Sequence, residues 1–431
     1  MNPPAAALDL VLQTFQSGFT QPTFALLLTL VQGWILCPGR HTLTRVYALG
    51  QLSAFPHSLD AYCRFFRCAK WSCGFLWQQL ARLAVNRFCP TGKIPVHMDD
   101  TAFHKSGRCI EGAAWWRDAV RSTGTKVVHC FGLNLLVLSL RLCPPWGGEP
   151  LSLPINVRLH RKKEATLLEL AQEMMAEVAT WFPDREFELA ADGFFACLAG
   201  RMPKAFHLFS RMRRDAAIFA PPPKTKGPRR GRPRKRGRRL PTPEQLAKTA
   251  RQWTKIKVQI RGRWLHRLVH VQDVLWYTVA PESLVRLVIV RDPAGKEPDD
   301  FFFTTDRTAT AVHVLETYAG RWAIEDTFRN VKQFLGGQHP QLWKGLGPER
   351  AAMFVFWLYG VIWLSYLMLP PAKHTWLLRA WYPRKSTPSF QDALAHWRRH
   401  YWRSLIFSKT EQSAILTKNL PRLLETLAYA A

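Results

Sequence analysis

The segment from Tyr318 to Lys332 combines one carboxylate with several cationic groups at helical spacing. At about 100° per residue, four of its polar side chains fall within roughly 60° of arc on one helix face: Tyr318, Arg321, Glu325 and Lys332. Such a stripe can be a solvated face of salt bridges. It can also be a site where the acid binds a metal ion and the bases bind phosphates. The choice depends on which other acids the fold brings to Glu325.

Two aspartates stand at the ends of predicted strands upstream of this helix. Residues 94–98 alternate between apolar and polar and run into Asp99 and Asp100, and residues 186–191 form a second strand pattern that ends at Asp192. Two aspartates on adjacent strands and a helix glutamate can hold two Mg²⁺ ions, which bind oxygen ligands and leave positions open for water and phosphate. Paired ions of this kind catalyse in-line phosphoryl displacement.

Each acid taken alone also has a structural explanation. Asp192 fits a turn, Asp99 fits a cap or loop, and Glu325 fits a salt bridge to a neighbouring arginine. Their joint occurrence in the order strand, strand, helix, strand, strand favours a shared site, because sites tend to form at strand ends in α/β proteins.

The charge of the chain indicates a polyanionic partner. The 431 residues include 60 Lys and Arg against 31 Asp and Glu, which gives a net charge of +29. Nucleic acid is the first expectation and an anionic membrane surface the second. A hydrophobic content of 47% indicates a folded protein, and the length suggests two or three domains.

The elements around the three acids follow from periodicity and breakers. Residues 164–182 have helical spacing, and residues 256–305 read as short strands separated by turns. The charged helix is expected to begin near Thr305 or Asp306 as its N-cap and to run to the stop signal at Gly336.

The segment 224–239 contains ten Lys or Arg and no acid, and its prolines and glycines exclude a regular helix. It includes an Arg-Gly-Arg-Pro core that is similar to an AT-hook, an extended segment that inserts arginines into a narrow minor groove. The alternative is a basic loop that binds phosphates without sequence preference. Both interpretations predict DNA contacts by three arginines of this segment: Arg230, Arg232 and Arg234.

Two further patterns leave alternatives open. Nine cysteines lie before residue 198 without a C-x-x-C pair; zinc binding by Cys63, Cys68 and Cys73 is conceivable, but the spacing favours buried free thiols. Residues 351–372 carry no charge and are long enough to span a membrane, but their Gly, Ser, Tyr and Pro content favours a buried core helix.

Three motifs of the chain together resemble the DDE transposases of bacterial insertion sequences: Asp99-Asp-Thr, Ala191-Asp192-Gly and Tyr318-x2-Arg321-x3-Glu325-x6-Lys332. The resemblance is to the group whose ribonuclease-H-like core is interrupted by a β-strand insertion before the glutamate, and it covers residues from about 90 to 370. A β-rich insertion would account for the 133-residue interval between Asp192 and Glu325.

The resemblance implies an α/β fold with a ribonuclease-H-like catalytic core, a β-rich insertion and an N-terminal helical domain. We expect five parts in chain order: an N-terminal helical domain for DNA ends at 1–90, the first half of the core at 91–210, the insertion at 211–305, the second half of the core at 306–372, and a helical C-terminal region at 373–431.

The resemblance also assigns roles to residues. It implies that three carboxylates bind two Mg²⁺ ions, with Mn²⁺ as a substitute: Asp99, Asp192 and Glu325. It implies that Arg321 and Lys332 contact phosphates near the cleaved end, and that Tyr318 contacts DNA or positions the helix. Asp99 is preferred to Asp100, because the family usually places its acid two residues before the threonine.

The expected function is that of a DNA transposase. It would bind double-stranded DNA at transposon ends and target, nick the ends by water attack, and transfer the freed 3′-hydroxyl to another strand. A dimer in the synaptic complex, no membrane association and a cytoplasmic, nucleoid-associated location are expected with it. The alternatives are a catalytically inactive DNA-binding protein derived from a transposase, and a membrane-associated basic protein that uses residues 351–372.

Overall fold

The computed structural model describes residues 7–53, 56–118, 121–223, 234–409 and 414–429. The N-terminal part is helical and includes one short 3₁₀ turn, η1. Its elements are α1 (Ala7–Gln13), η1 (Gln16–Gly18), α2 (Gln21–Leu36), α3 (Leu43–Gly50), α4 (Leu59–Arg67) and α5 (Cys73–Phe88).

A mixed sheet follows the N-terminal helices. Its first six strands are β1 (Ile94–His104), β2 (Ala114–Arg117), β3 (His129–Leu142), β4 (Leu151–His160), β5 (Phe187–Ala191) and β6 (Phe206–Arg211). Strand β1 pairs antiparallel with β3 and parallel with β5, and β5 pairs parallel with β6. Helix α6 (Leu167–Trp181) connects β4 to β5, and the 3₁₀ helix η2 (Gly193–Leu198) follows β5.

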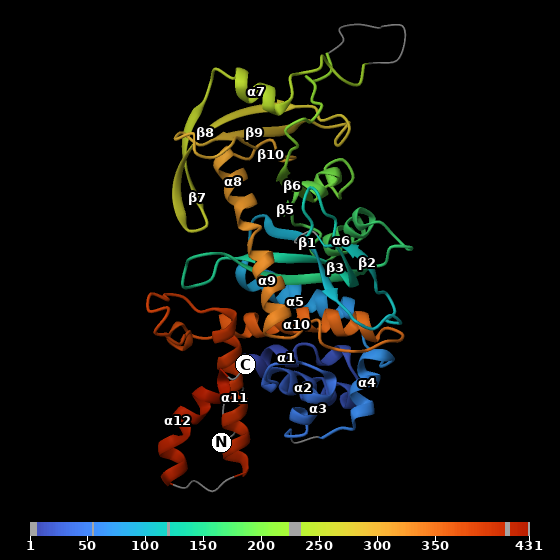
Figure 1. The fold of residues 1–431 in the computed structure, drawn as a ribbon, viewed down its shortest axis with the longest axis vertical. Coiled ribbons are helices and arrows are strands. Elements are labelled where there is room, and N and C mark those ends of the chain that lie inside the picture. Colours follow the sequence, from blue (N-terminus) through green and yellow to red (C-terminus); the bar gives the residue numbers. More distant parts are fainter. Residues whose placement is uncertain (1–6, 54–55, 119–120, 224–233, 410–413, 430–431) are drawn as a thin grey trace.

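The strands of the insertion extend this same sheet. They are β7 (Thr254–Ile260), β8 (Arg263–Val274), β9 (Val285–Arg291) and β10 (Asp300–Thr304), preceded by α7 (Pro243–Thr249). Strand β10 pairs antiparallel with β6 of the core, so the ten strands run in the order β2-β3-β1-β5-β6-β10-β9-β8-β7, with β4 also beside β3. The insertion lies at the end of the molecule remote from the N-terminal helices (Figure 1).

The rest of the chain is helical and covers the sheet. Its elements are α8 (Ala311–Gly320), α9 (Ala323–Gln333), α10 (Gly347–Leu367), η3 (Pro371–Lys373), α11 (Phe390–Lys409) and α12 (Ala414–Ala428). Helix α10 lies between the sheet and α1 to α4 (Figure 1) and is buried along nearly its whole length. It alone among the described helices is long and apolar enough to cross a membrane, and 94% of its apolar window is buried inside the protein. In this structure it is a core helix.

Two expectations about the site's elements were wrong. Asp99 and Asp100 lie inside β1, which continues to His104, because residues 99–104 keep pairing with β3. The charged helix is not continuous from Asp306. Thr310 caps α8, the chain turns at Arg321 and Trp322, and α9 starts at Ala323.

The expected fold class is confirmed. The chain has an N-terminal helical part and a large mixed sheet with helices, as in a ribonuclease-H-like core, and β-rich residues separate β6 from α8. The exact domain limits stay predictions, because the insertion and the core share one sheet.

Candidate active site

Parallel pairing of β1 and β5 brings the two aspartates together. The last register pair of these strands is Met98 with Ala191, so Asp99 and Asp192 are the next residue on each strand. Strand β5 ends there, and the Asp192 carboxylate accepts a hydrogen bond from the Phe194 amide as the N-cap of η2, at 3.0 Å. This bond fixes the orientation of the Asp192 side chain. The charge of Asp192 is near enough to Asp99 to raise its pKa.

Arg321 connects Asp99 to Glu325. One guanidinium nitrogen, Nη1, donates to Asp99 Oδ2 at 2.6 Å, and the other, Nη2, donates to Glu325 Oε1 at 3.3 Å. Only 12% of the Arg321 side chain is exposed, against 18% for Asp99 and 37% for Glu325. The acid on α9 and the acid on β1 therefore lie within reach of a single cation.

Asp99 and Asp100 point to opposite faces of the sheet, as neighbours on a strand must. Asp99 faces Arg321 and the α8–α9 junction. Asp100 is held by a side-chain hydrogen bond from Asn134 on the neighbouring β3 and lies near His160 on β4. Of the two, Asp99 shares Arg321 with Glu325.

Burial dominates the electrostatics of these acids. It raises the pKa of Asp99 to about 7, although the Arg321 guanidinium opposes the shift, and the Asp192 charge adds to it. Burial also raises the pKa of Glu325 against the same guanidinium. Carboxylates that are costly to ionise in the absence of a cation are suited to binding one.

The turn between α8 and α9 places aromatic and cationic groups beside Asp99 and Glu325. The Tyr318 ring, at the end of α8, packs against Phe302 of β10 with ring centroids 4.9 Å apart. The guanidinium of Arg321 lies 5.8 Å from the Tyr318 ring and that of Arg211 lies 5.9 Å from it. Tyr318 thus positions Arg321 from the side of the insertion. The sequence did not indicate Arg211 as part of this group.

The β7–β8 hairpin also reaches the site. Its two-residue turn consists of Arg261 and Gly262, both with positive φ (49° and 70°), the combination of a type I′ turn. The Arg261 guanidinium stacks 4.4 Å from the ring of Trp322, which is 45% exposed, and it contributes to the electrostatic environment of Glu325. The turn was visible in the sequence, but its place beside Glu325 was not.

The remaining predicted DNA contacts lie elsewhere. Lys332 is two turns further along α9; its electrostatic neighbours are Cys130 and Asp118, and burial lowers its pKa. Arg234 is the first described residue of the basic segment and is exposed; Arg236, two residues on, stacks on Phe219 at 4.7 Å. The predicted contacts Arg230 and Arg232 fall outside the described residues.

A histidine that sequence reasoning missed lies beneath the site. His97 is on β1, two residues before Asp99, and is 1% exposed. Neither of its ring nitrogens has a hydrogen-bond partner, and burial together with Arg141 and Arg321 holds its pKa well below the usual range. Neutral His97 therefore supports the Asp99 strand without adding charge.

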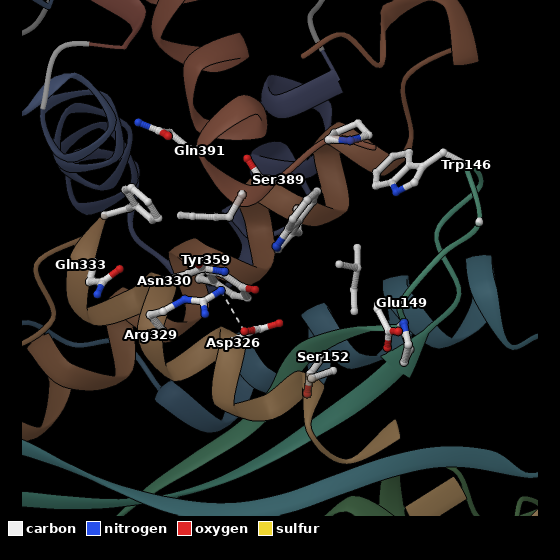
Figure 2. A pocket seen from close by; sticks show the side chains of 18 residues that line it. Trp146, Glu149, Ser152, Asp326, Arg329, Asn330, Gln333, Tyr359, Ser389 and Gln391 are labelled. Atoms are coloured by element: carbon white, nitrogen blue, oxygen red, sulfur yellow. Dashed lines mark ion pairs between the residues drawn. The ribbon is translucent and has the colours of Figure 1, made fainter. Parts of the chain in front are cut away.

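A cavity of about 330 Å³ lies against the other face of α9 (Figure 2). Its wall carries the Asp326–Arg329 ion pair, 2.8 Å long, and aromatic rings that include Trp146 and Tyr359. None of the site carboxylates lines it. The cavity is therefore separate from the site of Asp99, Asp192 and Glu325.

The donor set fits hard divalent cations. Asp99, Asp192 and Glu325 offer carboxylate oxygens, the ligands that Mg²⁺ and Mn²⁺ prefer. The position between Asp99 and Glu325 is already one where the protein places a cation, the Arg321 guanidinium.

Two known protein families match the sequence. The DDE superfamily endonuclease family matches residues 14–279, more than half of the chain, and the Transposase DDE domain family matches residues 199–360. The first match includes Asp99 and Asp192, and the second includes Glu325. Among curated proteins, none matches the sequence. Because one of these families matches more than half of its length, the chain belongs to the DDE superfamily of endonucleases and transposases.

Proposed function

We propose that this protein is an active DNA transposase that cleaves the ends of an insertion sequence and joins them to another strand. The observation that carries the proposal is the convergence of Asp99, Asp192 and the Arg321–Glu325 pair at one end of the β1–β5 ladder. Family membership indicates the class of reaction, and these three acids with Arg321 are the groups that would carry it out.

Asp99, Asp192 and Glu325 would hold two Mg²⁺ ions, or Mn²⁺ in their place. Bound there, the ions would supply Lewis-acid activation of the attacking oxygen and stabilise the leaving one. The protein's own contribution is positioning: β1 and β5 fix two acids on adjacent strands, and α9 adds the third.

Arg321 has two possible sets of partners in this scheme. Without substrate it neutralises Asp99 and Glu325. When cations occupy the carboxylates, the guanidinium is free to bind a DNA phosphate, which it can do in bidentate geometry. The Tyr318 ring lies beside the guanidinium, and Lys332 adds a cation on α9, two helical turns beyond Glu325.

The partners follow from the charge and the reaction. The net charge of +29 and the basic segment suit double-stranded DNA, both transposon ends and target. Joining two ends requires a synaptic complex, for which we propose a dimer. A cytoplasmic, nucleoid-associated location without membrane contact fits the same role.

The decisive test uses the inverted repeats that flank the gene as substrate. Glu325→Ala should abolish cleavage in Mg²⁺ and Mn²⁺ while leaving end binding intact, because the acid has no direct role in holding DNA. Asp326→Ala is the matched control: it removes the adjacent carboxylate of α9, which faces the cavity of Figure 2, and should cleave normally. Cleavage by Glu325→Ala would refute the assignment of the third ligand. Binding without cleavage by the unmodified protein in either metal would favour a DNA-binding protein that has lost its activity.

A further inference from the structure

Three side chains of the kinds that ligate metals lie close together at the end of β1, away from Asp99, Asp192 and Glu325. It consists of His104 at the end of β1, Asp118 directly after β2, and Cys130 at the start of β3. Their ligand atoms all lie within 4.8 Å of one another, and Asp118 and Cys130 are buried. Among the described residues, no other three His, Cys, Asp or Glu side chains bring their ligand atoms this close together, and Asp99, Asp192 and Glu325 do not.

Three neighbouring strands hold these side chains on one face. His104 is opposite Gly132 in the β1–β3 ladder, and Cys130 is two residues from Gly132 on the same strand. Gly132 has no side chain to separate them; a Cβ there would lie 2.1 Å from the Phe103 carbonyl oxygen. The imidazole and the thiol can therefore approach across the position that glycine leaves open.

The carboxylate of Asp118 is already oriented. Its Oδ1 accepts a hydrogen bond from the Arg121 amide at 3.0 Å, and its own amide donates to the Val128 carbonyl at 2.8 Å. The second oxygen, Oδ2, is turned toward His104 Nε2 at 3.9 Å. Backbone bonds that fix a carboxylate in this way serve as the outer support of many metal ligands.

We propose that His104, Asp118 and Cys130 form a Zn²⁺ site, separate from the catalytic carboxylates. Imidazole and thiolate ligands select Zn²⁺ over Mg²⁺, and three protein ligands leave a fourth position for water. A tetrahedral site needs ligand atoms about 3.3–3.8 Å apart, so side-chain rotations that close the present spacing by about 1 Å complete it. Binding deprotonates the thiol: the Zn–Sγ bond forms, and the proton of Cys130 passes to solvent.

The site has a charged neighbour in Lys332. Its ammonium group interacts with Asp118 and Cys130 and is the cation that balances the cluster without metal. Arg121 also approaches Asp118, with Nε 3.6 Å from Oδ2, but its side chain is 66% exposed and can turn away. A bound ion would change the charge that Lys332 meets at Asp118 and Cys130, so the site would act on a proposed phosphate contact.

Cobalt substitution tests the site on the full chain without DNA. Co²⁺ added in the presence of excess Mg²⁺ should bind with one equivalent showing a thiolate-to-cobalt charge-transfer band, and Zn²⁺ should displace it. Cys130→Ser should lose the band, and Asp118→Asn should weaken binding by about tenfold or more. The matched control is Cys109→Ser, which removes an exposed thiol outside the cluster and should leave the band unchanged.

Thermal unfolding of each variant without metal identifies a variant that fails to fold. A variant that loses only a metal ligand should unfold at the same temperature as the unmodified metal-free protein. Glu325→Ala should keep the band, so the result is independent of DNA cleavage. A band that survives Cys130→Ser, or no band in the unmodified protein, would overturn the proposal and leave the cluster as the counter-charge of Lys332.

Discussion

Replacing Arg321 with glutamine should tighten metal binding by the DNA-free protein. In the structure the guanidinium binds both Asp99 and Glu325, so a metal ion must displace it before it can reach either carboxylate. Glutamine keeps part of the side-chain volume but removes the charge. Metal binding to the variant then no longer includes the free-energy cost of displacing the Arg321 guanidinium.

The size of the effect follows from the two contacts. The bond to Asp99 is 2.6 Å long between groups that are 12% and 18% exposed, and a charge-assisted bond of this kind contributes about 1.5–3 kcal/mol. The contact to Glu325 is longer, at 3.3 Å, and that side chain is 37% exposed, so solvent screening reduces its contribution to about 0.5 kcal/mol. A total of about 2–3.5 kcal/mol corresponds to about 30- to 400-fold in affinity.

Protonation opposes the effect and sets the conditions of the assay. Asp99 has a pKa of about 7 with Arg321 present, and loss of the guanidinium raises that pKa further. Because only the ionised carboxylate binds metal, the gain should be larger near pH 9 than near pH 7. Calorimetric titration with Mn²⁺ at both pH values measures it.

Arg329→Gln is the control for this experiment. It removes an arginine of α9 that is paired with a carboxylate, Asp326, on the face of the helix away from Arg321, and it should not change Mn²⁺ affinity. Equal or weaker Mn²⁺ binding by Arg321→Gln near pH 9 would refute the displacement argument. By linkage, Mn²⁺ should tighten end binding in the unmodified protein and do so less in Arg321→Gln.

Three further predictions concern other positions. Asp100→Asn should cleave DNA within about tenfold of the unmodified rate, whereas Asp99→Asn should lose about 10³-fold or more in a nicking assay, because only Asp99 faces Arg321. Asp306→Asn should lower the free energy of unfolding in urea by about 1–3 kcal/mol at neutral pH. Burial raises the Asp306 pKa, but the bonds to Lys93 and Thr308 outweigh it and hold that pKa below its usual range. The difference in stability between the variant and the unmodified protein should therefore persist above about pH 4 and shrink as the pH falls below that. Gly336→Ala should lower the melting temperature with an unfolding cost of about 1–3 kcal/mol, since φ is +58° and the added Cβ would lie 2.4 Å from His339 Nδ1; an unchanged melting temperature would contradict this.

The strands that carry the aspartates could be predicted from sequence because alternation and a following acid mark them clearly. Residues 186–191 gave β5 almost to the residue, with Asp192 directly after it. Strand β1 was predicted too short, because two successive acids resemble the end of a strand. Inside a sheet they are tolerated here because Arg321 and Asn134 compensate them on opposite faces.

The sequence contains a helix-breaking residue at the α8–α9 break, but the continuous apolar periodicity made it look like an interior helix position. Gly320 stands in the middle of the predicted helix, and in the structure it lies against Arg141, where a Cβ would be 3.1 Å from that side chain. Apolar spacing continues across the break, so a period of 3.6 residues could not locate it. Arg321 bridges Asp99 and Glu325 only because this turn lies beside β1. No local sequence pattern indicates that these two segments are neighbours.

The cysteine spacing favoured free thiols, and the structure has no disulfide among the nine cysteines; the spacing did not indicate the proposed zinc cluster. Cys63, Cys68 and Cys73 are close in sequence, but they are not among the described groups of possible metal ligands. The cluster of His104, Asp118 and Cys130 has one residue on or beside each of three strands, with intervals that match no metal-binding motif. Strand register, which only the fold supplies, brings them together.

A ribosome completes β1 and β5 long before it reaches α9. The parallel pair of these strands requires only β2 to β4 and α6 between them, so Asp99 and Asp192 can be in place on the nascent chain. Glu325 is synthesised 133 residues after Asp192. Under the proposed function, a translation product that stops within the insertion would contain the N-terminal helices and two of three carboxylates. It would also lack α10, the core helix against which α1, α4 and α5 pack, so the insertion separates the first two acids from everything that completes the enzyme.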